Sequence, residues 1–203
     1  MLGLPKNTEV SLPLYKKDIL SNFDGTSKQK EMFNNEISSL KIVNELSTRS
    51  LPVESSTTIN GIFIIEVIPK YQEIHQDSIE MIFRLIPQHI VIVLHYNESI
   101  RLAIHQSKTF MTEWKEFGYT LNIEGLSIDE IWKHIVESIG NFQVAQGKNL
   151  DEQIEHDSEI QVILSNIEKL EIKKRNTKTP RMKYELHQQI QTLKNELKEL
   201  ERN

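Results

Sequence analysis

The sequence contains no cysteine, only seven glycines and no long hydrophobic run. The absence of cysteine excludes disulfide bonds, thiolate metal sites and cysteine nucleophiles, and it fits a reducing cytoplasm. No apolar segment approaches the ~20 residues that a membrane-spanning helix needs. Residues 1–6 lack the basic start and the long apolar stretch of a secretory signal. We therefore expect a cytoplasmic protein without a membrane segment.

Several catalytic motifs are also absent. The scattered glycines form neither a phosphate-binding loop nor a dinucleotide fingerprint, and there is no Gly-x-Ser-x-Gly or His-Glu-x-x-His pattern. We expect no cofactor. The net charge of -5 argues against a wholly basic nucleic-acid binder but leaves room for a local basic patch. A chain of 203 residues can hold one α/β domain with an extension.

The densest β-branched sequence lies between residues 60 and 105. Apolar runs cover residues 62–68 and 90–96, and they flank a helix-like segment at 77–86 that Asp77 and Glu80 are expected to cap. Two apolar strands joined by a helix indicate a parallel crossover. A turn at Asn97-Glu98 then predicts an antiparallel hairpin with a strand at 100–105.

The flanking segments complete the predicted domain. Residues 1–25 predict an irregular N-terminal arm, because Pro5 and Pro13 interrupt any helix. Thr26, with Gln29 at capping-box spacing, opens a helix expected to reach about Leu46. Further strands are expected at 110–114 and 119–121, and a helix at 127–140. The sequence thus predicts an α/β (α+β) fold over residues 26–145, with a mixed β-sheet of four to five strands and flanking helices.

The C-terminal residues 149–203 predict a different structure. Apolar residues recur at intervals of three and four in two series, from Ile160 to Leu170 and from Leu186 to Leu200. Asn149 can cap the first helix, and Thr179 with Pro180 can start the second. We expect an antiparallel helical hairpin, similar to a coiled coil, with a tip around residues 173–183.

Glu66 is the conspicuous charge in the first apolar run. A buried carboxylate is costly unless it is paired, so the structural interpretation pairs it with Lys70 or Arg101, or places it at a sheet edge. The functional alternative makes Glu66 a metal-binding carboxylate of a nuclease-like core. His89, His95 and His105 lie at strand ends, but the expected register points His95 and His105 to opposite faces, so no metal site is predicted.

A basic cluster marks the expected hairpin tip. Between residues 172 and 184 the chain has six basic side chains and no acid. They are Lys173, Lys174, Arg175, Lys178, Arg181 and Lys183. Such a cluster is a solvated turn or a contact for nucleic-acid phosphate or an acidic partner. Lys6, Lys16 and Lys17 make the N-terminal arm mildly basic, so it is either a strap across the domain or a phosphate-contacting arm.

Several stretches resemble an uncharacterised bacterial family, domain of unknown function 4391. The opening residues 1–10, with Pro13 and Lys16-Lys17, look like the start of the family. Pro87 with residues 90–96 looks like its central strand. Residues 112–114, 126–130 and 173–200 look like later segments. The sequence departs from the family in having Glu113 where Asp is more frequent, and Asn176-Thr177 in a break that is usually more basic and aromatic.

The resemblance implies a setting and no catalytic residues. Members are similar to small proteins encoded beside helicases and DNA methyltransferases in restriction-type or anti-phage defence clusters. The leading hypothesis is a non-catalytic accessory subunit that docks on a helicase-type ATPase or a DNA methyltransferase. The alternatives are a metal-dependent nuclease-like subunit and a non-catalytic nucleic-acid-binding module. A homo-oligomer is compatible with each of them.

Overall fold

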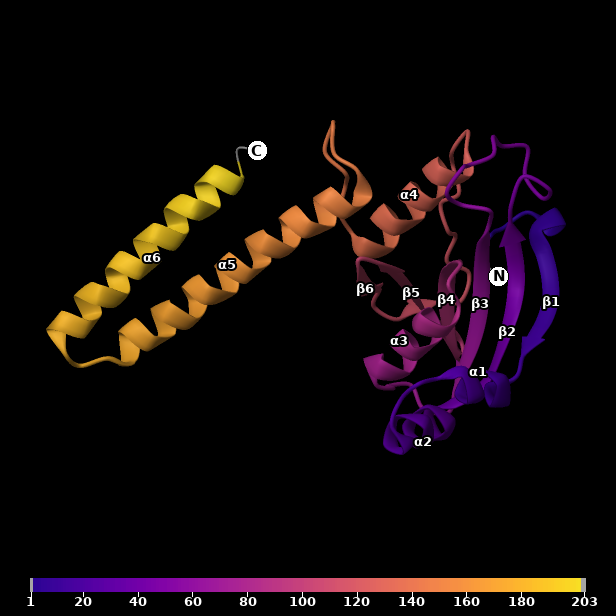
Figure 1. Cartoon of the computed structure of the whole chain (residues 1–203), viewed down its shortest axis with the longest axis horizontal. Helices are drawn as coiled ribbons and strands as arrows, with labels where there is room; N and C mark the ends of the chain where they lie inside the picture. Colours follow the sequence, from indigo (N-terminus) through magenta and orange to yellow (C-terminus); the bar gives the residue numbers. More distant parts are fainter. Residues whose placement is uncertain (1, 202–203) are drawn as a thin grey trace. The chain divides into compact units, whose positions relative to one another are not determined.

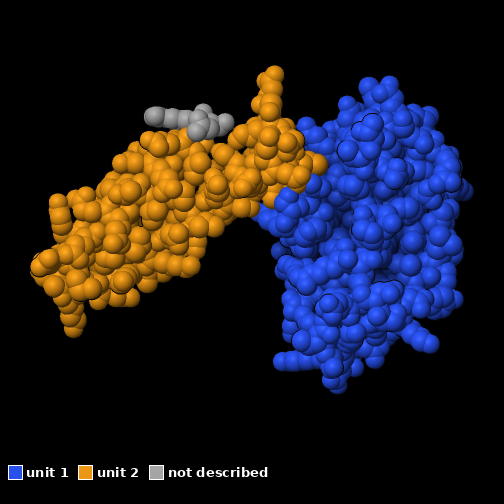
Figure 2. Space-filling model, viewed as in Figure 1, with its two compact units in different colours: residues 1–143 blue, residues 144–203 orange. Residues whose placement is uncertain are grey.

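The computed structural model describes residues 2–201, which divide into two compact units between Gln143 and Val144 (Figure 2). Unit 1, residues 1–143, carries the sheet. Unit 2, residues 144–203, consists of two long helices and the segment that leads into them.

Within residues 2–201, unit 1 contains a mixed sheet of seven strands in the order β1-β2-β3-β4-β5-β6, with β7 paired to β5 (Figure 1). The strands are Glu9–Leu14 (β1), Ile37–Leu46 (β2), Ile62–Pro69 (β3), His89–Tyr96 (β4), Ser99–Gln106 (β5), Lys108–Met111 (β6) and Lys115–Glu116 (β7). β3 and β4 are parallel, as predicted, and the other pairs are antiparallel. The mixed α+β class is confirmed, but the sheet is larger than the four to five strands predicted.

β2 occupies a segment that was predicted to be helical. The helix that Thr26 caps, α2, covers only Ser27–Glu36, and the predicted capping box with Gln29 is present. The next ten residues pair with β3 instead. Two register shifts in this pairing, after Ile37 and after Ile42, disturb the strict alternation of a strand. The resulting apolar spacing imitates a helical period, which explains the error.

The prediction of an irregular arm over residues 1–25 is wrong. This segment contains a short 3-10 helix, Lys6–Thr8, then β1 and a helix α1, Lys16–Asn22. β1 pairs with β2 at the edge of the sheet, a position in which proline is tolerated. Ile19 and Phe23 are buried in the core.

Helices cover both faces of the sheet. The buried side chains of α1, α2 and α3 (Gln76–Leu85) pack in one cluster with Ile65 and Val67 of β3 and with Ile92 of β4. Residues one position away along these strands point to the other face. That face meets α4 (Ile128–Gly140), whose Trp132 ring packs edge-on against His89 and donates a hydrogen bond to Gln106.

The strand ends and helix caps differ from the prediction in detail. The Asn97-Glu98 turn is confirmed: His95 lies opposite Ile100, and Asn97 adopts the left-handed conformation that such turns require. The helix predicted at 127–140 is α4, and Ser127 caps it. The predicted Asp77 cap is wrong, because α3 begins after His75. The predicted strand at 119–121 is also wrong, since the last strand lies at 115–116.

Unit 2 is an antiparallel helical hairpin of α5, Leu150–Asn176, and α6, Pro180–Leu200 (Figure 1). Asn149 caps α5 as predicted, in a capping box with Glu152, and Pro180 occupies the first turn of α6. Ile163, Ile167 and Ile190 are buried between the helices, and Leu170, Leu193, Leu197 and Leu200 pack against them. His156 bonds to the carbonyl of Leu200, and Lys194 bonds to Glu171, so the two helices run in opposite directions. The apolar seam is therefore internal to the hairpin.

Candidate functional site

Glu66 forms a pair with a residue that the sequence did not suggest. Its carboxylate lies 3.0 Å from Nδ1 of His95, and Nε2 of that ring lies 2.9 Å from the carbonyl oxygen of Asn97. The ring of Phe117 packs against the same imidazole at 5.2 Å. Both ring nitrogens are thus engaged, and the contact ties β3 to the turn that follows β4.

The partners expected for Glu66 are occupied elsewhere. Lys70 donates to the backbone carbonyl of Asn34 at 3.0 Å. Arg101 donates to the carbonyl of Thr112 at 2.7 Å and approaches Glu73 at 3.6 Å. The sheet-edge alternative is also wrong, because β3 lies between β2 and β4. Glu66 is paired, as the structural interpretation required, but across two parallel strands.

The geometry around Glu66 does not favour metal chemistry. In the part of the chain that the structure describes, no group of three or more His, Asp or Glu side chains could hold a metal ion. The three strand-end histidines are separated as predicted: His89 packs on Trp132, His95 pairs with Glu66, and His105 packs on Phe83.

A buried carboxylate, that of Glu36, was missed by the sequence reasoning. Glu36 ends α2, and its side chain accepts a hydrogen bond from Ser78 at 2.6 Å and one from the backbone N–H of His75 at 3.2 Å. It also binds Nδ1 of the His75 ring. This hydrogen bond, together with the charge of Glu36 and a smaller contribution from Asp77, raises the pKa of His75. Glu36 therefore anchors the start of α3, where a negative charge is favourable.

One lysine of the N-terminal segment, Lys16, is engaged in contacts within the domain. Lys16 donates to Oδ1 of Asn34 at 3.0 Å and to the carbonyl of Ile37 at 2.9 Å. Desolvation, with the nearby charge of Lys70, lowers the pKa of Lys16. This lysine therefore stabilises the junction between α2 and β2.

The six predicted basic residues of the tip separate into two groups. Lys174, Arg175 and Lys183 line a groove of about 430 Å³ between α5 and α6. Glu171, His187 and Lys194 line it as well. Lys173 and Lys178 are exposed outside it, and Arg181 pairs with Glu185 at 3.1 Å. We call this feature the basic groove.

Cationic side chains outnumber acids in the lining of the basic groove. Its one acid, Glu171, accepts a hydrogen bond from Lys194 at 3.1 Å. That bond and the charge of Lys194 lower the pKa of Glu171, and Arg175 and Lys174 lower it further. Nζ of Lys174 lies 3.3 Å from Nδ1 of His187, which places both side chains in the groove.

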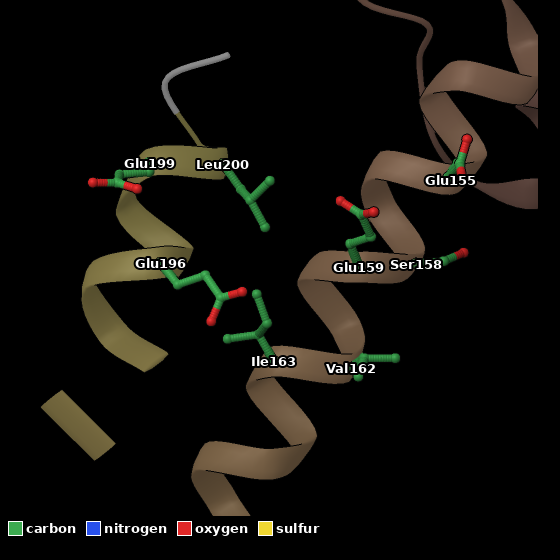
Figure 3. Close-up of a pocket in the computed structure, with 8 residues that line it drawn as sticks. All are labelled: Glu155, Ser158, Glu159, Val162, Ile163, Glu196, Glu199 and Leu200. Atoms are coloured by element: carbon green, nitrogen blue, oxygen red, sulfur yellow. The ribbon is translucent and has the colours of Figure 1, made fainter. Parts of the chain in front are cut away.

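A second groove on the hairpin is acidic and has a volume of about 600 Å³. Its four carboxylates belong to Glu155, Glu159, Glu196 and Glu199, and no Lys or Arg is among the described residues that line it. Figure 3 shows Glu159 of α5 and Glu196 of α6 reaching toward the space between the helices, with Ile163 below them. Val162 on its rim is 59% exposed. We call this feature the acidic groove.

The two grooves lie on opposite sides of the apolar seam. Glu155, Glu159 and Val162 are spaced by four and three residues, so they form one stripe along α5. This stripe continues through Lys173, whereas Glu171 and Arg175 fall on the other side of the seam formed by Ile163 and Ile167. The sequence spacing of these glutamates could have suggested the acidic groove, but their neighbours on α6 could not be assigned without the pairing of the helices.

Comparison with known proteins gives one match. No curated protein and no solved structure matches the chain. No helix within residues 2–201 is long and apolar enough to cross a membrane. The model of the family described as Domain of unknown function (DUF4391) matches residues 2–197, which is nearly the whole sequence. The chain therefore belongs to this family, as its opening residues and its C-terminal helices suggested.

Proposed function

We propose that this protein is a non-catalytic accessory subunit whose helical hairpin docks onto a larger protein. The observation that carries the proposal is the acidic groove. Four carboxylates around one groove repel one another, and a cationic partner surface relieves that repulsion and gains complementary contacts. The partner segment that fits carries basic side chains and an apolar residue for Val162.

The distribution of exposed apolar side chains supports the hairpin as the docking element. Of the ten large hydrophobic residues that are exposed within the described chain, five lie on α5 and α6. They are Val162, Leu164, Ile172, Met182 and Tyr184. The hairpin residues number about 60 of 203, so an even spread would place about three of the ten there. Among the five, Val162 lines the acidic groove, where it can add an apolar contact to the charge complementarity.

Unit 1 fits the role of a scaffold in this proposal. Its most conspicuous polar groups are committed to internal contacts: Glu66 with His95, and Glu36 with His75 and Ser78. The metal-dependent nuclease-like alternative would need Glu66 to face a metal together with other acids, and the geometry around His95 offers no such set in residues 2–201.

The setting of the proposal comes from the family resemblance. It implies a bacterial, cytoplasmic protein that acts in a restriction-type or anti-phage defence system. We propose a helicase-type ATPase or a DNA methyltransferase as the docking partner.

The test is co-purification of the tagged full-length chain with the products of its neighbouring genes. The double variant Glu159→Lys and Glu196→Lys should lose the partner. The matched control is the double variant Glu168→Lys and Glu185→Lys, which makes the same charge change at exposed positions of α5 and α6 outside the acidic groove. Retention of the partner by the double variant would contradict docking at the acidic groove.

A second candidate is non-catalytic binding of nucleic acid. The specific observation that favours it is the basic groove, where Lys174, Arg175 and Lys183 gather with a single acid that Lys194 already pairs. The two candidates use different sides of the hairpin and are compatible in one protein.

A further inference from the structure

We propose that the basic groove binds single-stranded nucleic acid, with phosphates against Lys174, Arg175 and Lys183 and a base stacked on Tyr184. The inference rests on the nucleic-acid-binding candidate and is independent of docking at the acidic groove. It assigns the ligand class, the strandedness and the residues.

The charge of the groove selects an anionic ligand. Cationic side chains come from both helices, and the single carboxylate among the lining residues, that of Glu171, is paired with Lys194. The hydrogen bond and charge of Lys194 lower the pKa of Glu171, and Arg175 and Lys174 lower it further. No acidic residue lies in the first turn of α6 to reduce the positive charge of the groove.

The shape of the groove suits an extended polyanion better than a small anion. On α6, Lys183 and Lys194 stand at the two ends of the lining with His187 between them, eleven residues apart, which at 1.5 Å per residue is about 16 Å. Lys174 and Arg175 face this row from α5. A groove of that length can contact several successive phosphates of one strand.

The aromatic side chain next to the groove favours a single strand over a duplex. Tyr184 is 65% exposed, and it lies three residues before His187 and seven before Gln191, so it projects from the same face of α6 as two residues that line the groove. Bases of a single strand are free to stack on an aromatic ring, whereas those of a duplex are already stacked on one another. A flexible strand can place phosphates in the groove and a base on the ring.

Binding of a labelled oligothymidylate of about 16 nucleotides to the full-length protein tests the inference. Three phosphate contacts predict a slope of log K against log salt concentration of about -2 for a single strand. Lys183→Gln and Arg175→Gln should each weaken binding and reduce the magnitude of the slope by about 0.7. Tyr184→Ala should weaken single-strand binding roughly 5- to 150-fold, and Tyr184→Phe should retain it.

The matched control is Lys173→Gln. Lys173 has the same charge and lies in the same turn as Lys174, but it does not line the groove. Its loss should leave the slope within experimental error of the wild type. Equal effects of Lys173→Gln and Lys174→Gln would overturn the inference, because they would indicate diffuse attraction to the hairpin tip.

Two further results would also overturn it. One is the absence of binding by the wild type at about 50 mM salt, where phosphate contacts are strong. The other is an equal loss of affinity for the single strand and for a duplex of the same length in Tyr184→Ala. That result would show that the ring does not act by stacking on an unpaired base. Association of Lys183→Gln with the protein partner, measured in parallel, separates this inference from the docking proposal. A variant that loses nucleic-acid binding but still binds the partner shows that the basic groove acts separately from the docking surface.

Discussion

Nδ1 of His95 lies 3.0 Å from the carboxylate of Glu66, and this contact crosses two adjacent parallel strands. It accounts for an acidic residue in the middle of an apolar strand. The pair is partly buried, with 20% of the Glu66 side chain and 26% of the His95 side chain exposed. Its role is therefore to hold the turn after β4 in place.

Glu66→Gln should lower the free energy of unfolding by about 1–3 kcal/mol, since it weakens a hydrogen bond to a charged group. Urea unfolding measures the change. His95→Gln should have a similar effect, and the double variant should cost less than the sum of the two because the residues are partners. Additive costs would contradict the pairing.

Cleavage of DNA by the wild type with magnesium or manganese, lost in Glu66→Gln, would support the nuclease alternative instead.

The contact between His75 and Glu36 should make stability depend on pH. The folded-state pKa of His75 is raised, so its contribution is fully present below its unfolded pKa of about 6.5 and is lost as pH rises through the folded value. His89 acts in the opposite sense. Burial lowers its pKa, so its protonation favours the unfolded chain and stability decreases as pH falls. The wild-type curve alone therefore mixes two effects.

A difference measurement isolates His75. The urea midpoint of the wild type minus that of His75→Gln should decrease as pH rises from below to above neutrality. In a Glu36→Gln background the same difference should be nearly independent of pH. A difference that grows with pH in the wild-type background would refute the assignment.

The helical hairpin should unfold independently of the core of unit 1. Ile190→Ala removes a buried side chain from the interface between α5 and α6 and should cost about 2–5 kcal/mol. Two helices depend on their packing for stability, so the hairpin should lose helix content by far-UV circular dichroism. Both tryptophans, Trp114 and Trp132, lie in unit 1, and their fluorescence should not change. The exposed neighbour Gln189→Ala is the control. A simultaneous change in tryptophan fluorescence would mean that the units unfold together.

Local signals in the sequence predicted the features that depend on neighbouring residues. The capping box at Thr26, the cap at Asn149 and the turn at Asn97 involve contacts within a few residues, and all three are confirmed. Residues 37–46 were mispredicted because strand formation there depends on pairing with β3, which is distant in sequence. Their apolar spacing alone fits either structure.

The sites required information that spans the fold. Glu66 and His95 are 29 residues apart, and their register on parallel strands determines the contact. Lys173 and Lys174 are adjacent in the basic cluster, yet only Lys174 lines the basic groove. The contributions of His187 and Lys194 follow from the alignment of α6 with α5, which the spacing of one helix does not specify.

The most direct test of the central claim, that the hairpin is the docking element, is hydrogen exchange of the full-length protein with and without its co-purified partner. Docking at the acidic groove predicts slower exchange in residues 151–163 and 192–200, because these segments carry its four glutamates. Exchange in the strands of unit 1 should be unchanged. Protection confined to the sheet, with both helices of the hairpin unaffected, would contradict the account.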